Sequence, residues 1–166
     1  MNFLGRDEAN SLEKKLRRQM ADQPGAKLVL YYKSGARDYS HAANAIAAST
    51  GKFTQVTLLF LWCLSGGWSG HTATNGQWSR YRQWREAAGE KRPLYDAPGH
   101  QFEPHEVEHL SKAVEFALQL GWDALVAAKP RRQLLLLSHD DRMEIYRGFE
   151  RRLLAEKLIA LGYWHR

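Results

Sequence analysis

Three short apolar segments in the last third of the chain constrain the fold most strongly. Residues 122–129, 133–138 and 143–147 are each the length of a strand, and residues 130–132 and 139–142 separate them with proline, arginine, histidine and aspartate. Connections this short join neighbouring antiparallel strands. The sequence therefore predicts a three-stranded antiparallel meander. The first two segments carry few charges, which predicts strands that are buried on both faces.

The first half of the chain alternates helical and strand-like segments. Leu12, Leu16 and Met20 recur at four-residue spacing, which predicts a helix over 7–21. A strand at 27–33 and an alanine-rich helix at 39–50 follow, and the apolar run 53–64 comes next in the chain. Because that run begins with aromatic and β-branched residues, we favour a strand, although its leucine-rich end would also suit a buried helix. The order predicts a β-α-β crossover.

Three further helices are expected, over 77–88, from Pro104 to Gly121, and over 149–161. Helices and strands together predict an α+β fold, with a mixed sheet of about five strands that ends in the antiparallel meander and is covered by four or five helices. The length of 166 residues suits one hydrophobic core. We therefore expect a single globular domain over residues 1–166.

Composition and cysteine content favour a protein of the cytoplasm. The only cysteine, Cys63, lies in an apolar run, so we expect a buried thiol and a reducing compartment. Residues 1–23 read as a polar amphipathic helix rather than a secretory signal. The most apolar stretch, 56–64, is about half the length of a membrane-spanning helix, so no span is expected. No motif calls for a cofactor.

Positive charge is concentrated in the first half of the chain. Residues 1–83 carry 11 lysines and arginines against 5 acidic residues, whereas residues 84–166 carry 13 of each. The sequence pI is about 9.5. This asymmetry raises the expectation of a polyanionic partner without establishing one, because a charge of +6 is common in proteins that bind no polyanion.

One short motif is typical of metal-dependent hydrolases. His105, Glu106 and His109 match the pattern H-E-x-x-H, in which two histidines one helical turn apart hold zinc and the glutamate activates a water molecule. Pro104 directly precedes the motif and favours the first turn of a helix over its middle.

The predicted helical orientation also disfavours a metal site there. On an ideal helix His105 and His109 point about 160° away from the apolar stripe that begins at Val107. A third ligand would have to come from another segment, such as those with His71 or His100. We favour a solvated helix start and no bound metal, and keep a hydrolase that uses His105, Glu106 and His109 as a second alternative.

A segment of alternating basic and aromatic residues carries the main functional hypothesis. Arginine neutralises phosphate, and tryptophan or tyrosine stacks on unpaired bases. Such a surface suits nucleic acid, whereas the plainer interpretation is a helix whose Trp84, Tyr81 and Ala88 pack inward. The predicted nucleic-acid-binding residues are Trp78, Arg80, Tyr81, Arg82, Trp84, Arg85, Lys91 and Arg92.

A protein-binding role is the first alternative. Exposed tryptophans such as Trp68, Trp78 or Trp164 could anchor a partner, as in a regulator, an inhibitor or an immunity-like factor. A continuous positive groove would favour nucleic acid, and a large apolar patch would favour a protein partner. We expect binding rather than catalysis, with nucleic acid slightly preferred and the oligomeric state left open.

Overall fold

The fold is that of a computed structural model, which confirms the α+β class. No helix within its described residues is long and apolar enough to cross a membrane. Trp68 and His71, a possible partner anchor and a possible metal ligand, lie outside those residues. The structure describes residues 1–22, 27–32, 38–50, 53–64, 76–130, 133–146 and 151–165.

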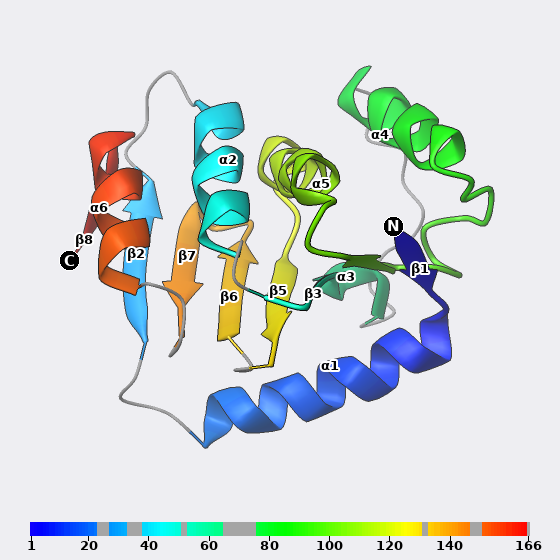
Figure 1. The fold of residues 1–166 in the computed structure, drawn as a ribbon, viewed down its shortest axis with the longest axis horizontal. Helices are drawn as coiled ribbons and strands as arrows, with labels where there is room; N and C mark the ends of the chain where they lie inside the picture. Colours follow the sequence, from blue (N-terminus) through cyan, green and yellow to red (C-terminus); the bar gives the residue numbers. More distant parts are fainter. Residues whose placement is uncertain are drawn as a thin grey trace.

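An eight-stranded sheet forms the centre of the molecule (Figure 1). Its spatial order is β1-β4-β3-β5-β6-β7-β2-β8. Every pair of neighbours is antiparallel, so the expected mixed sheet of about five strands is wrong in pairing and in number. The strands are β1 Asn2–Leu4, β2 Leu28–Tyr32, β3 Gln55–Phe60, β4 Gly99–Phe102, β5 Ala124–Lys129, β6 Gln133–Ser138, β7 Arg142–Ile145 and β8 Tyr163–His165.

Helices cover both faces of the sheet, as Figure 1 shows. One face packs against α2, α4, α5 and α6, and the other packs against α1 and the four-residue turn α3. The described residues thus hold five helices of ten residues or more, in agreement with the expected four or five. Their bounds are α1 Arg6–Ala21, α2 Tyr39–Ser49, α3 Leu61–Leu64, α4 Gly76–Ala87, α5 Val107–Leu120 and α6 Arg151–Ala160.

The predicted β-α-β crossover exists, but other strands separate its two strands. β2 and β3 run in the same direction, and β5, β6 and β7 lie between them. These three strands are the predicted meander, and residues such as Leu125 and Val126 of β5 pack against opposite faces. Because the meander lies between the two crossover strands, every pair of neighbouring strands is antiparallel. The local sequence does not indicate this placement of the meander.

The apolar run 53–64 divides between the two structures considered for it. Its first part is β3, and its leucine-rich end is the helical turn α3, which contains the buried Cys63. The thiol pKa is raised to about 12, chiefly because burial disfavours the thiolate. This cysteine is therefore a core residue, as expected.

Gly99 allows three strands to approach one another closely beside the functional region. A Cβ atom at this position would lie 2.9 Å from Cβ of Leu4 on β1 and 2.9 Å from Cδ2 of Leu59 on β3. No side chain fits there without displacing its neighbours. The glycine therefore lets β4 pair with β1 on one side and with β3 on the other.

Candidate functional site

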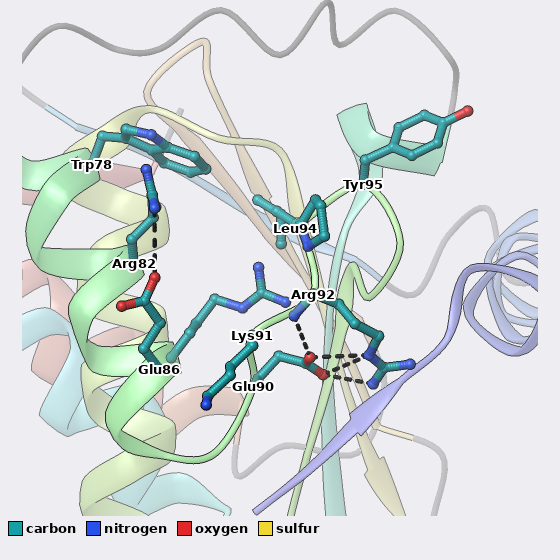
Figure 2. Close-up of a pocket in the computed structure, with 10 residues that line it drawn as sticks. Trp78, Arg82, Glu86, Glu90, Lys91, Arg92, Leu94 and Tyr95 are labelled. Atoms are coloured by element: carbon teal, nitrogen blue, oxygen red, sulfur yellow. Dashed lines mark hydrogen bonds and ion pairs between the residues drawn. The ribbon is translucent and has the colours of Figure 1, made fainter.

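A pocket of about 440 Å³ lies between α4 and the segment that follows it (Figure 2). Its volume falls within the range of small-molecule sites, roughly 300 to 1,000 Å³. Figure 2 shows residues of α4 on one side and residues of the following segment on the other. The lining residues are Trp78, Arg82, Arg85, Glu86, Glu90, Lys91, Arg92, Pro93, Leu94 and Tyr95.

Helical geometry and a left-handed glycine position these two sides. Trp78, Arg82 and Arg85 are spaced by four and three residues, so they share one side of α4. The chain leaves the helix at Gly89, whose φ of 89° suits glycine, and the Glu90 backbone N–H donates to the Arg85 carbonyl at 2.9 Å. The chain therefore turns back beside the helix and closes the pocket.

The structure separates the eight predicted binding residues into two groups. Five of them line the pocket, namely Trp78, Arg82, Arg85, Lys91 and Arg92. Tyr81 and Trp84 instead face the core: Tyr81 has no exposed surface, and Trp84 is half-buried and stacks on His100 with ring centroids 5.9 Å apart. For these two residues the plainer interpretation, inward packing, holds.

Arg80 does not join the pocket either. It is exposed, and the 100° step of an α-helix places it about 160° around α4 from Arg82. The basic and aromatic residues of α4 therefore do not form one continuous surface along the helix. The cations meet only where the helix faces the following segment, which the alternating sequence pattern does not indicate.

Glu90 and Arg92 hold the second side of the pocket in place. The Glu90 carboxylate is buried and accepts from Nε of Arg92 at 3.0 and 3.1 Å and from the Arg92 backbone N–H at 2.8 Å. Nη2 of Arg92 also donates to the Phe3 carbonyl of β1 at 3.3 Å. Hydrogen bonds from Arg92 lower the pKa of Glu90. This ion pair fastens the segment to the edge of the sheet.

Arg85 lies at the inner end of the lining and is 3% exposed. Its Nη2 donates to the Ala97 carbonyl at 3.0 Å, while its Nε has no hydrogen-bond partner. Among the described residues no carboxylate lies within ion-pair distance of this guanidinium, although Glu90, which pairs with Arg92, attracts it from farther away. Burying a cation in this way is unfavourable unless an anion or water compensates it.

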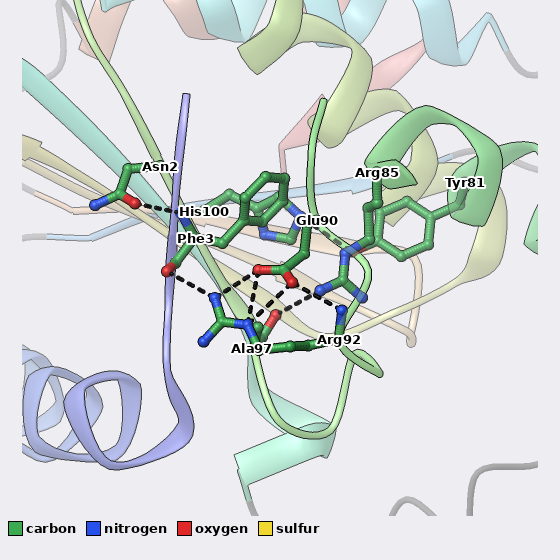
Figure 3. A network of polar contacts seen from close by, with 8 residues as sticks. All are labelled: Asn2, Phe3, Tyr81, Arg85, Glu90, Arg92, Ala97 and His100. Atoms are coloured by element: carbon green, nitrogen blue, oxygen red, sulfur yellow. Dashed lines mark hydrogen bonds and ion pairs between the residues drawn. The ribbon is translucent and has the colours of Figure 1, made fainter. Parts of the chain in front are cut away.

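Behind the pocket, Tyr81 and His100 form a buried polar pair within an aromatic cluster (Figure 3). The Tyr81 hydroxyl lies 3.0 Å from Nε2 of His100, and Nδ1 of His100 has no partner. Burial, followed by repulsion from Arg85, lowers the pKa of His100 well below its usual value, so the ring is neutral at pH 7. The cluster packs α4 against the sheet.

The H-E-x-x-H residues do not share a helical face. α5 begins at Val107 rather than at Pro104, so His105 lies in the preceding turn. Glu106 accepts from the N-terminal ammonium of Met1 and from the Glu103 backbone N–H. Within the described residues, no three histidine, cysteine or acidic side chains are close enough together to hold a metal ion. The geometry adds no support to the hydrolase alternative.

The sequence did not indicate two pairs of interacting residues. Tyr95, which is 46% exposed, lines the pocket, and the Arg6 guanidinium lies 3.6 Å from its ring centroid. Beside the central strands β5 and β6, Nδ1 of His139 lies 2.9 Å from Oδ1 of Asp123, which raises the histidine pKa. Both pairs join residues distant in sequence, so no local pattern could indicate them.

The lining of the pocket combines an excess of positive charge with apolar side chains. Four cationic side chains face two carboxylates in its lining, leaving a surplus of two positive charges. Trp78, Leu94 and Tyr95 supply apolar surface. Comparison of the chain with protein-family models, with curated proteins and with solved structures found no match. Its function therefore has to be inferred from the pocket itself.

Proposed function

We propose that this chain is a non-catalytic binding protein for single-stranded nucleic acid and that it binds through the pocket between α4 and residues 90–95. The observation that carries the proposal is the gathering of five predicted binding residues from two separate segments around one cavity. Cations and flat rings in one cavity are the two groups that contact phosphate and base in single-strand recognition.

The charge of the pocket supports an anionic ligand. Lys91 is exposed and, like Arg85, has no ion-pair partner among the described residues. Arg82 pairs with Glu86 at 3.5 Å in an exposed contact, which a phosphate could displace at little cost. Two to three cations are thus available to phosphate groups.

The shape of the pocket supports an unpaired strand over a duplex. A cavity of about 440 Å³ holds a small organic group, and its rings line the wall of that cavity, Trp78 from α4 and Tyr95 from the segment that follows the helix. A base must leave the double helix to reach such a wall, and unpairing costs a few kcal/mol. Single strands are therefore expected to bind more tightly than duplexes of the same sequence.

A protein partner is the second candidate, and it would use the other end of the sheet. Leu153, Ile159 and Trp164 are large apolar residues with 46%, 47% and 42% of their surface exposed. They belong to α6 and to the edge strand β8. These residues lie far along the sheet from the pocket, so variants at either place distinguish the two candidates. In either role we expect the chain to act in the cytoplasm.

Fluorescence anisotropy with short single-stranded and duplex oligonucleotides tests the proposal. We expect single strands to bind. A plot of the logarithm of the binding constant against the logarithm of the salt concentration should have a slope of about −1.4, as for two phosphate contacts. Charge reversal by Lys91→Glu or Arg82→Glu should weaken binding by about tenfold or more.

Lys157→Glu on α6 is the matched control, since it reverses one exposed cation outside the pocket. It should change affinity less than about threefold. Absence of binding at low salt, or equal effects of the three reversals, would contradict the proposal. Loss of binding to a protein partner on Trp164→Ala, with no binding of oligonucleotides, would favour the second candidate.

A further inference from the structure

The buried, unpaired guanidinium of Arg85 indicates what part of a ligand enters the pocket. Only 3% of Arg85 is exposed, yet the residue lines the cavity. Its Nε is buried and has no partner, and its Nη2 donates a hydrogen bond to the Ala97 carbonyl. Guanidinium groups bind phosphate through two parallel hydrogen bonds, so an unused N–H at a buried position favours an anion that reaches inward.

The number of cations without a carboxylate partner indicates which ligand charge the pocket favours. Glu90 is occupied by Arg92, and Glu86 is paired with Arg82. The cations without a carboxylate partner among the described residues are Arg85 at the inner end and Lys91 at the exposed rim. Together they match a dianion better than a single negative charge.

Because Arg85 is buried, a terminal phosphate of a nucleic-acid strand can reach it more easily than an internal phosphodiester can. An internal phosphodiester carries one negative charge and has a sugar attached on both sides, so the chain would have to enter and leave the cavity. A terminal phosphate monoester carries nearly two negative charges at pH 7 and has a sugar on one side only. It can reach a buried cation while its nucleoside contacts the apolar part of the lining, which Trp78, Leu94 and Tyr95 provide.

We propose that the pocket binds a phosphate monoester joined to a nucleoside, with the phosphate on Arg85 and Lys91 and the nucleoside against Trp78 and Tyr95. Such a group occurs at the phosphorylated end of a strand and in a free nucleotide. Binding of a phosphorylated strand end rests on the proposed function, whereas binding of a free nucleotide at the phosphate site does not. The proposal makes the pocket selective for phosphorylated ends, which general single-strand binding does not require.

The test compares short oligothymidine strands that differ only at one end. Strands with a 5′-phosphate, a 3′-phosphate or hydroxyls at both ends are titrated with the protein, and thymidine 5′-monophosphate is titrated separately by calorimetry. We expect one phosphorylated strand to bind about tenfold more tightly than the hydroxyl strand, as one or two charge-assisted hydrogen bonds provide.

Variants then assign this preference to residues. Arg85→Gln should reduce the preference to less than about twofold, and Lys91→Gln should reduce it to about threefold. Because Lys91 is exposed, the second variant tests the site even if Arg85→Gln does not fold. Lys157→Gln should leave the preference unchanged.

Each outcome separates this proposal from the proposed function. Equal affinity for phosphorylated and hydroxyl strands would overturn the phosphate site and leave single-strand binding in place. Binding of thymidine 5′-monophosphate, lost in Lys91→Gln, with no binding of any strand would keep the phosphate site and overturn nucleic-acid binding. Absence of binding to every probe would overturn both.

Discussion

The Tyr81 hydroxyl and Nε2 of His100 lie 3.0 Å apart in the interior, between α4 and β4. Since neither side chain has exposed surface, each is the other's hydrogen-bond partner in a place that water does not reach. The pair therefore connects the helix that bears the pocket to the sheet beneath it.

Removing this hydroxyl should destabilise the fold. In Tyr81→Phe the buried His100 Nε2 loses its partner, and its Nδ1 already has none. We expect the free energy of unfolding to fall by about 1 to 3 kcal/mol in urea denaturation. Tyr95→Phe is the control, because its ring is 46% exposed, and it should change stability by less than about 0.5 kcal/mol. Equal stability of the two variants would show that the hydrogen bond contributes nothing.

The depressed pKa of His100 should make stability fall in mild acid. Below about pH 6.5 the unfolded chain takes up a proton at this residue that the folded chain does not, so stability is lost as pH decreases through this range. The slope should approach about 1.4 kcal/mol per pH unit. His139, whose pKa is raised by Asp123, acts in the opposite direction, since its contribution is lost as pH rises through its folded pKa.

Denaturation across pH 5 to 7.5 checks this dependence. His100→Gln keeps an amide that can bond to Tyr81 but does not titrate, so its stability should vary less with pH than that of the wild type. Parallel curves for the two proteins would mean that the acid sensitivity comes from other groups.

Replacing Glu90 should lower the stability of the fold more than replacing Glu86. Glu90→Gln weakens a buried, bidentate contact with Arg92 and should cost about 1 to 3 kcal/mol. Glu86→Gln removes an exposed pair with Arg82 at 3.5 Å and should cost less than about 0.5 kcal/mol. Thermal melts of both variants check the difference, and a larger loss in Glu86→Gln would contradict the role given to Glu90.

Gly99→Ala should strongly disturb the edge of the sheet. The added methyl group would lie 2.9 Å from atoms of the buried residues Leu4 and Leu59, and because the Leu4 atom is a Cβ fixed to the main chain, the backbone must move. We expect a loss of about 1 to 3 kcal/mol from overpacking. Gly5→Ala has its nearest atom at 3.9 Å and should cost less than about 1 kcal/mol. A stable Gly99→Ala protein would show that the strands can separate locally without cost.

Local periodicity was sufficient to predict the five long helices and five of the eight strands in the described part of the chain. The helices near 7–21 and 77–88 and the meander all depend on spacing within one segment, and each lies within two residues of its expected position. The sheet order could not be predicted in the same way. β1, β4 and β8 are three or four residues long, and they become strands only because β4, β3 and β2 respectively offer each of them an unpaired edge.

The site was predictable only in part, for a related reason. Composition identified the cations and rings of α4, but helical angle decides which of them share a side, and Arg80 and Tyr81 turn away from Arg82. The return of the chain at Gly89 brings Lys91 and Tyr95 to the same cavity. This return and the burial of Arg85 are tertiary features, which no short motif in the sequence encodes.

Photochemical cross-linking of a short single strand, followed by peptide mass spectrometry, tests most directly whether the pocket binds nucleic acid. Aromatic side chains in contact with bases are the expected sites of attachment. We expect cross-links at Trp78 or Tyr95 that disappear in Lys91→Glu and persist in Lys157→Glu. Cross-links confined to Trp164 or Tyr31, or no cross-links at low salt, would contradict binding at the pocket.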